Sequence, residues 1–231
     1  MTIKPDSSKT VSSQLFEAIR ADIIAGVLPP DSKLNVKELT ERYSASAMPL
    51  REALSRLANS GLVEAIDQRG FRVTSVSAEE LLDVTRTRQL IETAALRKAI
   101  TTKDVQWEAA VLAAHHNLKS LPILMEDDIA SLNPEWEAAH DAFHKTLIGG
   151  AGSRWLSNFA TTLRDQSARY RRASVATRAA RARDVAAEHA QIVEAILERD
   201  ADAACALLAA HFGATTDLLL ADFGAAAVAT R

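Results

Sequence analysis

The chain has 231 residues, which is enough for one large domain or two small ones. Hydrophobic residues make up 48% of it and aromatic residues only 5%, which excludes a largely disordered chain and favours helices over a β-sandwich or barrel. The net charge of −3 does not indicate a polyanionic partner, and the single cysteine, Cys205, fits a reducing cytoplasm. No apolar run approaches the roughly 18 residues of a membrane span, and residues 1–10 lack the apolar segment of a secretory signal.

Residues 1–76 predict a winged helix-turn-helix domain, because the expected elements follow in the order helix, helix, turn, helix, hairpin. Thr10 can cap the first helix, and Gly26 ends it. The other expected elements are the helices Val36–Tyr43 and Ala47–Asn59 and the strands Leu62–Ile66 and Phe71–Val76.

The helix expected over Ala47–Asn59 is the one that such a domain inserts into the major groove of DNA. Ala47, Arg51 and Ser55 share one face of it at four-residue spacing, opposite the apolar stripe. Arg51 is the best candidate for reading a base, because its guanidinium can bind O6 and N7 of guanine together. The alternative is that the arginines of this helix are ordinary solvated charges.

Four further residues suit contacts with the DNA backbone or minor groove. Lys37 and Arg56 suit phosphates. Arg69 and Gly70 form the expected hairpin tip, where an arginine suits the minor groove and a glycine allows close approach of the backbone.

Residues 77–231 predict a second domain that is wholly helical, so the fold class is mainly α. The short segment Thr74–Ala78 is the expected linker between the two domains. The expected helices are Ala78–Ile100, Lys103–Leu118, Pro134–Leu147, Ser153–Ala173, Arg181–Glu198 and Ala201–Phe223.

Four histidines of the helical domain are candidates for a metal site. His140 and His144 lie at i, i+4 and so face the same way, whereas His189 and His211 lie on two other expected helices. Ligands from several helices of a bundle can converge on one ion. Histidine spacing alone is a weak signal, and core or surface histidines remain the alternative.

The N-terminal part resembles the GntR superfamily of bacterial transcription regulators. The resemblance rests on the segments Gly26–Pro30, Met48–Leu57, Gly61–Val63 and Arg69–Val73. It implies that Arg51 and Lys37 contact DNA and that Arg69 and Gly70 are the tip of the wing. Ala47 stands where this family often has an arginine, which implies a different operator preference.

The C-terminal part resembles the FCD effector domain of the FadR subfamily, and about six helices suggest its shorter, VanR-like group. The resemblance rests on Arg88 with Glu92, His140–His144, Glu188 with His189, and His211. It implies that His144, His189 and His211 hold a divalent metal. His140 occupies the position of the usual carboxylate ligand, so the fourth ligand is His140 or a reoriented Asp141. A neutral fourth ligand favours Zn²⁺ or Ni²⁺.

The resemblance also implies that Arg88 binds the carboxylate of an effector, whereas the simpler interpretation is a surface ion pair between Arg88 and Glu92. Glu188 is a candidate partner for one of the imidazole rings. The basic run at 169–183 is most simply a solvated face or an interdomain contact, and the alternative is that one of its arginines reaches the pocket.

We therefore expect a ligand-responsive repressor and not an enzyme. It would bind a palindromic operator as a homodimer, take a small organic acid as effector and have no membrane partner. Two alternatives remain: a metal-dependent hydrolase or isomerase built on the histidines, and a helical interaction protein with a histidine-containing core.

Overall fold

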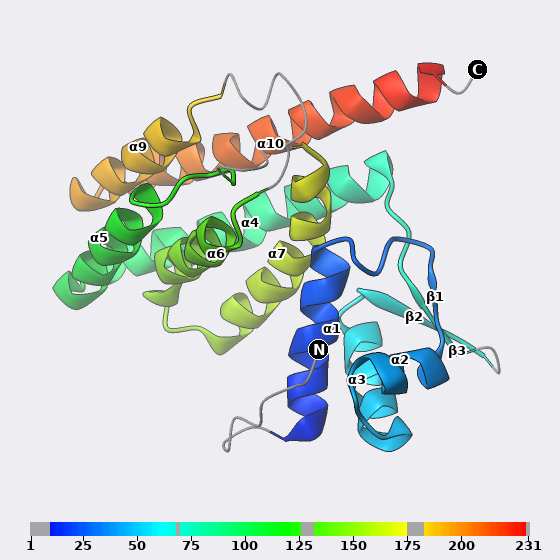
Figure 1. Ribbon diagram of the computed structural model, residues 1–231. Helices are drawn as coiled ribbons and strands as arrows, with labels where there is room; N and C mark the ends of the chain where they lie inside the picture. Colours follow the sequence, from blue (N-terminus) through cyan, green and yellow to red (C-terminus); the bar gives the residue numbers. More distant parts are fainter. Residues whose placement is uncertain (1–9, 68–69, 126–131, 175–182, 230–231) are drawn as a thin grey trace. The chain divides into compact units, whose positions relative to one another are not determined.

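A computed structural model describes residues 10–67, 70–125, 132–174 and 183–229, with the side chains of 171–174 and 222–229 left out of the description. The fold is mainly α, as predicted, and the chain divides into two compact units, Met1–Ser77 and Ala78–Arg231 (Figure 1). The first unit has the elements of a winged helix-turn-helix, and the second is a helical bundle.

The described part of the first unit contains three helices, and local sequence sets their ends. Helix α1 (Val11–Ile24) begins at Thr10, whose side chain accepts a hydrogen bond from the backbone of Ser13 at 3.2 Å. Helices α2 (Val36–Arg42) and α3 (Ala47–Asn59) complete the set. One face of α3 is buried through Leu50, Ala53, Leu54 and Leu57, which leaves its opposite face to solvent.

A three-stranded antiparallel sheet, in the order β1-β3-β2, completes the first unit. Strands β2 (Val63–Ile66) and β3 (Gly70–Val73) form the expected hairpin, with Val63 opposite Val73. Strand β1 (Lys33–Leu34) pairs with β3 and was not expected, because two residues are too short for a periodic pattern.

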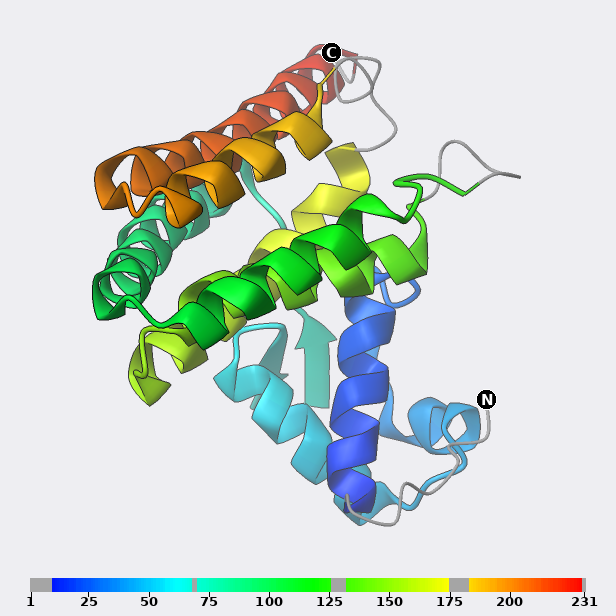
Figure 2. The same cartoon turned by 90° about the vertical axis from the view of Figure 1, so that its left-hand side faces the viewer.

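Six helices make up the described part of the second unit. Tertiary contacts join α4 to α7 and α10, α9 to α5 and α10, and α6 to α5 (Figures 1 and 2). Buried apolar side chains of these helices form one core that includes Leu96, Phe143, Ile192 and Leu208. The helices are α4 (Ala78–Thr102), α5 (Val105–Lys119), α6 (Pro134–Gly149), α7 (Arg154–Ser174), α9 (Val185–Leu197) and α10 (Ala201–Ala229).

Helix starts differ from expectation where a capping residue lies inside the expected helix. Asp104 caps α5 after Lys103 adopts a positive φ of 53°, so this helix begins at Val105. Asp184 caps α9 by accepting a hydrogen bond from the backbone of Ala187 at 2.9 Å. Residues 181–182, which were expected to begin this helix, lie outside the described residues.

One helix among the described residues, α10, is long and apolar enough over Ala201–Ala221 to meet the length and composition criteria for a membrane span. This result corrects the expectation that no stretch comes close to those criteria. The core helix of a soluble bundle meets the same criteria, and α10 packs against α4 and α9.

Candidate functional site

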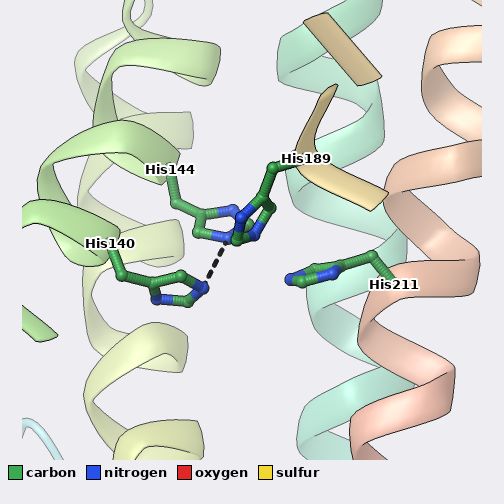
Figure 3. A group of neighbouring side chains, drawn as sticks. All are labelled: His140, His144, His189 and His211. Carbon is green, nitrogen blue, oxygen red and sulfur yellow. Dashed lines mark hydrogen bonds between the residues drawn. The ribbon is translucent and has the colours of Figure 1, made fainter. Parts of the chain in front are cut away.

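Four histidine side chains meet inside the helical unit. His140 and His144 come from α6, His189 from α9 and His211 from α10, and their rings converge (Figure 3). One nitrogen from each ring lies within 4.8 Å of the corresponding nitrogen of every other ring, and all four residues are buried. The Nε2 atoms of His140 and His144 are 3.2 Å apart. The four residues are hereafter the histidine cluster.

Local packing fixes these rings. On α6, residues 136, 140, 143 and 144 share the buried face, and the Trp136 ring stacks on that of His140 with centroids 4.7 Å apart. Phe143 lies against His189 with ring centroids 5.0 Å apart. Helical periodicity therefore places all four imidazoles in the core, although it cannot show that they meet at one point.

Burial favours the neutral form of three histidines of the cluster. Removal from water, with repulsion from neighbouring rings, lowers the pKa of His144 well below its usual 6.5. Burial lowers the pKa of His189 to about 2 and also lowers the pKa of His211. Neutral imidazole is the form that binds metal ions.

The charged residues beside the cluster fix His211. Glu188 Oε2 accepts a hydrogen bond from His211 Nδ1 at 2.8 Å, and Arg183 forms an ion pair with the same carboxylate. Arg183 also donates to the backbone oxygen of His211 at 2.8 Å and to Thr215 Oγ1 at 2.7 Å. Burial raises the pKa of Glu188, but the hydrogen bonds from His211 and Arg183 prevail and lower it to about 2. Among the described side chains of the basic run, Arg183 reaches this region.

The donor set fits a divalent metal ion. Four imidazole nitrogens match the tetrahedral N-ligand chemistry of zinc, for which metal–nitrogen bonds of about 2.0–2.1 Å put neighbouring nitrogens about 3.3 Å apart. The 3.2 Å between His140 and His144 agrees with this spacing, whereas a separation at the 4.8 Å limit would have to shorten by about 1.5 Å on metal binding. The buried Nε2 of His189 has no hydrogen-bond partner among the described residues, as expected of a nitrogen that binds a metal ion.

Arg88 lies buried near this cluster, with a relative exposure of 5%. Its Nε donates to Glu92 Oε1 at 2.8 Å, its Nη1 donates to Ser167 Oγ at 2.9 Å, and its guanidinium lies 3.9 Å from the ring centroid of Phe212. The pair with Glu92 exists but is buried, so the interpretation as a surface pair is wrong. Its positive charge contributes to lowering the pKa values of His144 and His211.

Asp141 on α6 and Arg164 on α7 form an ion pair. Asp141, the alternative metal ligand, forms an ion pair with Lys145 at 2.6 Å and lies 3.4 Å from Arg164. Sequence reasoning did not single out Arg164, which is 5% exposed and lies 3.7 Å from Glu92. Its charged partners come from α4 and α6, so no charge spacing within α7 indicates its role.

The residues expected to contact DNA lie mainly on the open face of α3. Ala47, Arg51 and Ser55 are exposed there, and Lys37 is exposed on α2. The side chain of Arg51 forms no ion pair with any residue that the structure describes.

Two other expected DNA contacts differ in their surroundings. Arg56 donates to Ser13 Oγ at 3.2 Å and lies 4.6 Å from the ring centroid of Phe16, so it also joins α3 to α1. Gly70 begins β3 with a positive φ of 95°, which suits glycine at a turn. Arg69 lies outside the described residues.

Comparison with known proteins identifies both units. The family of bacterial regulatory proteins named gntR matches residues 11–73, and the FCD domain family matches residues 83–214. The transcriptional regulator BphR of Paraburkholderia xenovorans is 38% identical over 196 residues, covering 85% of this chain and 80% of BphR. The transcriptional repressor GlaR of Escherichia coli is 37% identical over 200 residues, covering 85% and 90%.

Among solved structures, Escherichia coli McbR/YncC matches with a TM-score of 0.77 and 18% identity, covering 93% of this chain and 99% of that one, which shows the fold alone. Fold and sequence together define a DNA-binding transcription regulator. The chain belongs to the GntR family and carries an FCD domain after its winged helix-turn-helix. Its relatives are regulators, which confirms that it is not the metal-dependent hydrolase or isomerase considered as an alternative.

Proposed function

We propose that the chain is a repressor whose affinity for its operator is controlled by a small organic acid. This acid would bind beside a divalent metal ion in the helical unit. The observation that carries this proposal is the meeting of four buried imidazoles from three helices within 4.8 Å. The similarity to GlaR of Escherichia coli, a transcriptional repressor, supports repression.

His140, His144, His189 and His211 would hold the metal. Four neutral ligands leave the full double charge on the ion, and imidazole nitrogen favours zinc or nickel over magnesium. When bound, the ion would supply positive charge, and a carboxylate would bind to it as a fifth ligand by expanding the four-nitrogen coordination. Glu188 would keep Nδ1 of His211 protonated and so leave Nε2 for the metal.

Arg88 would bind a carboxylate of the effector. A guanidinium can donate two parallel hydrogen bonds to a carboxylate, and such charge-assisted bonds are strong in a buried site. Glu92 and Ser167 already accept hydrogen bonds from Arg88, so the effector must compete with them or use the remaining N–H groups.

The winged unit would read the operator in the cytoplasm. Arg51 and Ser55 would face the major groove with Ala47 at the start of the helix, and Lys37 and Arg56 would contact phosphates. Arg69 and Gly70 would form the tip of the wing. One such unit reads only a short half-site, so a two-fold homodimer on a palindromic operator is the expected assembly.

The effector controls DNA binding only if it prefers one arrangement of the regulator over another. An acid with equal affinity for the DNA-bound and free forms would leave the operator occupied. The segment at residues 74–78 joins the winged unit directly to α4, the helix that carries Arg88. This segment is the covalent link through which effector binding in the helical unit would change the winged unit.

The metal part is tested by elemental analysis of the purified chain. We expect about one equivalent of zinc or nickel per chain in the wild type and less than a tenth in His144→Ala. His116→Ala is the matched control because this histidine is exposed on α5, and it should keep the metal. Equal metal content in the two variants would refute the site.

The regulatory part is tested by nuclease protection of DNA upstream of the gene. The metal-loaded protein should protect a two-fold symmetric site, and screening small acids by thermal shift should yield one that removes this protection. Protection that persists with every stabilising acid would contradict control by an acid.

A further inference from the structure

The buried carboxylate of Glu92 lies between two buried guanidinium groups. Glu92 is 0% exposed, and its Oε1 accepts a hydrogen bond from Arg88 Nε at 2.8 Å. Its Oε2 lies 3.7 Å from Nη1 of Arg164, beyond hydrogen-bond distance. One carboxylate therefore serves two arginines, and only Arg88 is fully paired with it.

Arg164 keeps donors that no described residue uses. Its Nη2 donates to Thr161 Oγ1 at 3.1 Å, whereas Nε and Nη1 are buried and have no hydrogen-bond partner among the described residues. Oδ1 of Asp141 lies 3.4 Å from Nε in an ion pair that lacks hydrogen-bond geometry, and Oδ2 of Asp141 contacts Lys145 at 2.6 Å. Buried charged donors without acceptors are costly, so this arrangement calls for an additional anion.

Arg88 lies beside the histidine cluster, and Arg164 is connected to it through two carboxylates. The guanidinium of Arg88 covers Phe212, whose ring lies 5.7 Å from that of His144. Arg164 is linked to Arg88 through Glu92, and to Asp141 on α6, the helix that carries His140 and His144. An acid bound between the cluster and Arg88 would therefore have a second cation within its surroundings.

We propose that Arg164 is a second anion contact of the effector, and that the effector accordingly carries two carboxylates. This inference rests on the proposed function. Arg88, Arg164 and Glu92 together bear one positive charge before any metal is added, and a bound divalent ion raises the total to three. A monocarboxylate would neutralise one of these charges and leave Nε and Nη1 of Arg164 without acceptors. A dicarboxylate supplies acceptors for both ends of the site.

The test compares acids that differ only in the second carboxylate. Straight-chain dicarboxylates from malonate to adipate are titrated into the zinc-loaded full chain by calorimetry, each against the monocarboxylate of equal carbon number. We expect one dicarboxylate to bind at least about tenfold more tightly than its monocarboxylate partner, the effect of one charge-assisted hydrogen bond.

The variant Arg164→Gln assigns the effect to this side chain. It should weaken binding of that dicarboxylate by about 10- to 100-fold and change binding of the monocarboxylate by less than threefold. Arg154→Gln is the matched control, since it removes an exposed arginine from the same helix and should change neither affinity. Arg164→Lys keeps the positive charge and is used if the glutamine variant does not fold. Its loss of affinity for the dicarboxylate should be smaller than that of Arg164→Gln.

The outcomes separate this inference from the proposed function. Equal affinity for a monocarboxylate and its dicarboxylate partner would overturn the inference and leave acid control intact. An equal loss of both acids in Arg164→Gln would also overturn it, because it would give Arg164 a structural role only. If no acid of any kind binds to the metal-loaded chain, the proposed function itself fails.

Discussion

Nδ1 of His211 lies 2.8 Å from Oε2 of Glu188, and the same carboxylate forms an ion pair with Arg183. The ring is thereby held in the tautomer with a proton on Nδ1, which leaves Nε2 for the histidine cluster. A carboxylate that orients a ligating imidazole in this way supports the metal without touching it.

Glu188→Gln should therefore weaken metal binding by about 10- to 100-fold, because an amide orients the ring without the charge that strengthens it as a ligand. Competition with a chromophoric chelator measures this affinity. Glu194→Gln, at an exposed position of the same helix, is the control and should leave it unchanged. An unchanged affinity in Glu188→Gln would mean that this contact does not serve the metal site.

The metal-free chain should lose stability as the pH falls. Burial lowers the pKa of His189 to about 2 and that of His144 well below 6.5, whereas both rings titrate near 6.5 in the unfolded chain. Below pH 6.5 the unfolded state binds more protons, so the free energy of unfolding decreases toward the lower folded pKa values.

Urea unfolding in the presence of a chelator, between pH 8 and 5, measures this dependence. His189→Asn should show a shallower decrease than the wild type, and His116→Ala the same decrease. A free energy of unfolding that stays constant or rises between pH 7.5 and 5.5 would contradict the account of buried neutral histidines.

Arg51 and Arg56 should affect DNA binding in different ways. Arg51→Ala removes an exposed side chain proposed to read a base, so affinity for the operator should fall by about 10- to 100-fold, with little change for unrelated DNA. Arg56→Ala removes a proposed phosphate contact and should weaken binding to both DNAs alike, with a smaller salt dependence. Fluorescence anisotropy with the two DNAs distinguishes these outcomes. An equal loss on both DNAs for Arg51→Ala would argue against base recognition.

The adjacent glycines at the end of α6 should respond oppositely to alanine. A Cβ on Gly150 would lie 2.7 Å from Cγ of the Trp107 ring, which is held by a hydrogen bond from its Nε1 to the backbone oxygen of Thr146 at 2.8 Å. Gly150→Ala should lower the free energy of unfolding by about 1–3 kcal/mol. Gly149→Ala adds a Cβ with no neighbour within 4 Å and should leave it unchanged or slightly raised.

Tryptophan fluorescence during urea unfolding measures this difference, because Trp107, Trp136 and Trp155 all belong to the helical unit. Equal stability of the two alanine variants would show that the Trp107 ring moves aside without cost.

Periodicity predicted most of the fold because each helix buries one continuous face. The apolar face of α3 and the hairpin after it depend on residues close in sequence. Both are present in the structure, and the ends of the two strands differ from the predicted ends by a few residues. Strand β1 was not predicted, because it is defined by its pairing with β3, which is distant in the sequence. Aspartate caps moved the starts of α5 and α9, since capping competes with apolar spacing at a helix end.

The site was predictable only in part. His140 and His144 are neighbours on one helix, so their shared direction follows from spacing. Arg88 and Glu92 are also spaced for a pair, but only tertiary packing against Phe212 and Ser167 makes that pair buried. Arg164 gives no signal in the sequence, because all its charged partners lie on other helices.

The most direct test of the central claim is the dissociation constant of the operator complex, measured with and without zinc and with and without the acid that binds most tightly. Fluorescence anisotropy of a labelled operator gives the four values. We predict that the acid weakens operator binding at least about tenfold in the zinc-loaded protein and less than twofold in the zinc-free protein, because the histidine cluster holds the ion that holds the acid. Operator binding that is insensitive to the acid in both forms would contradict the account.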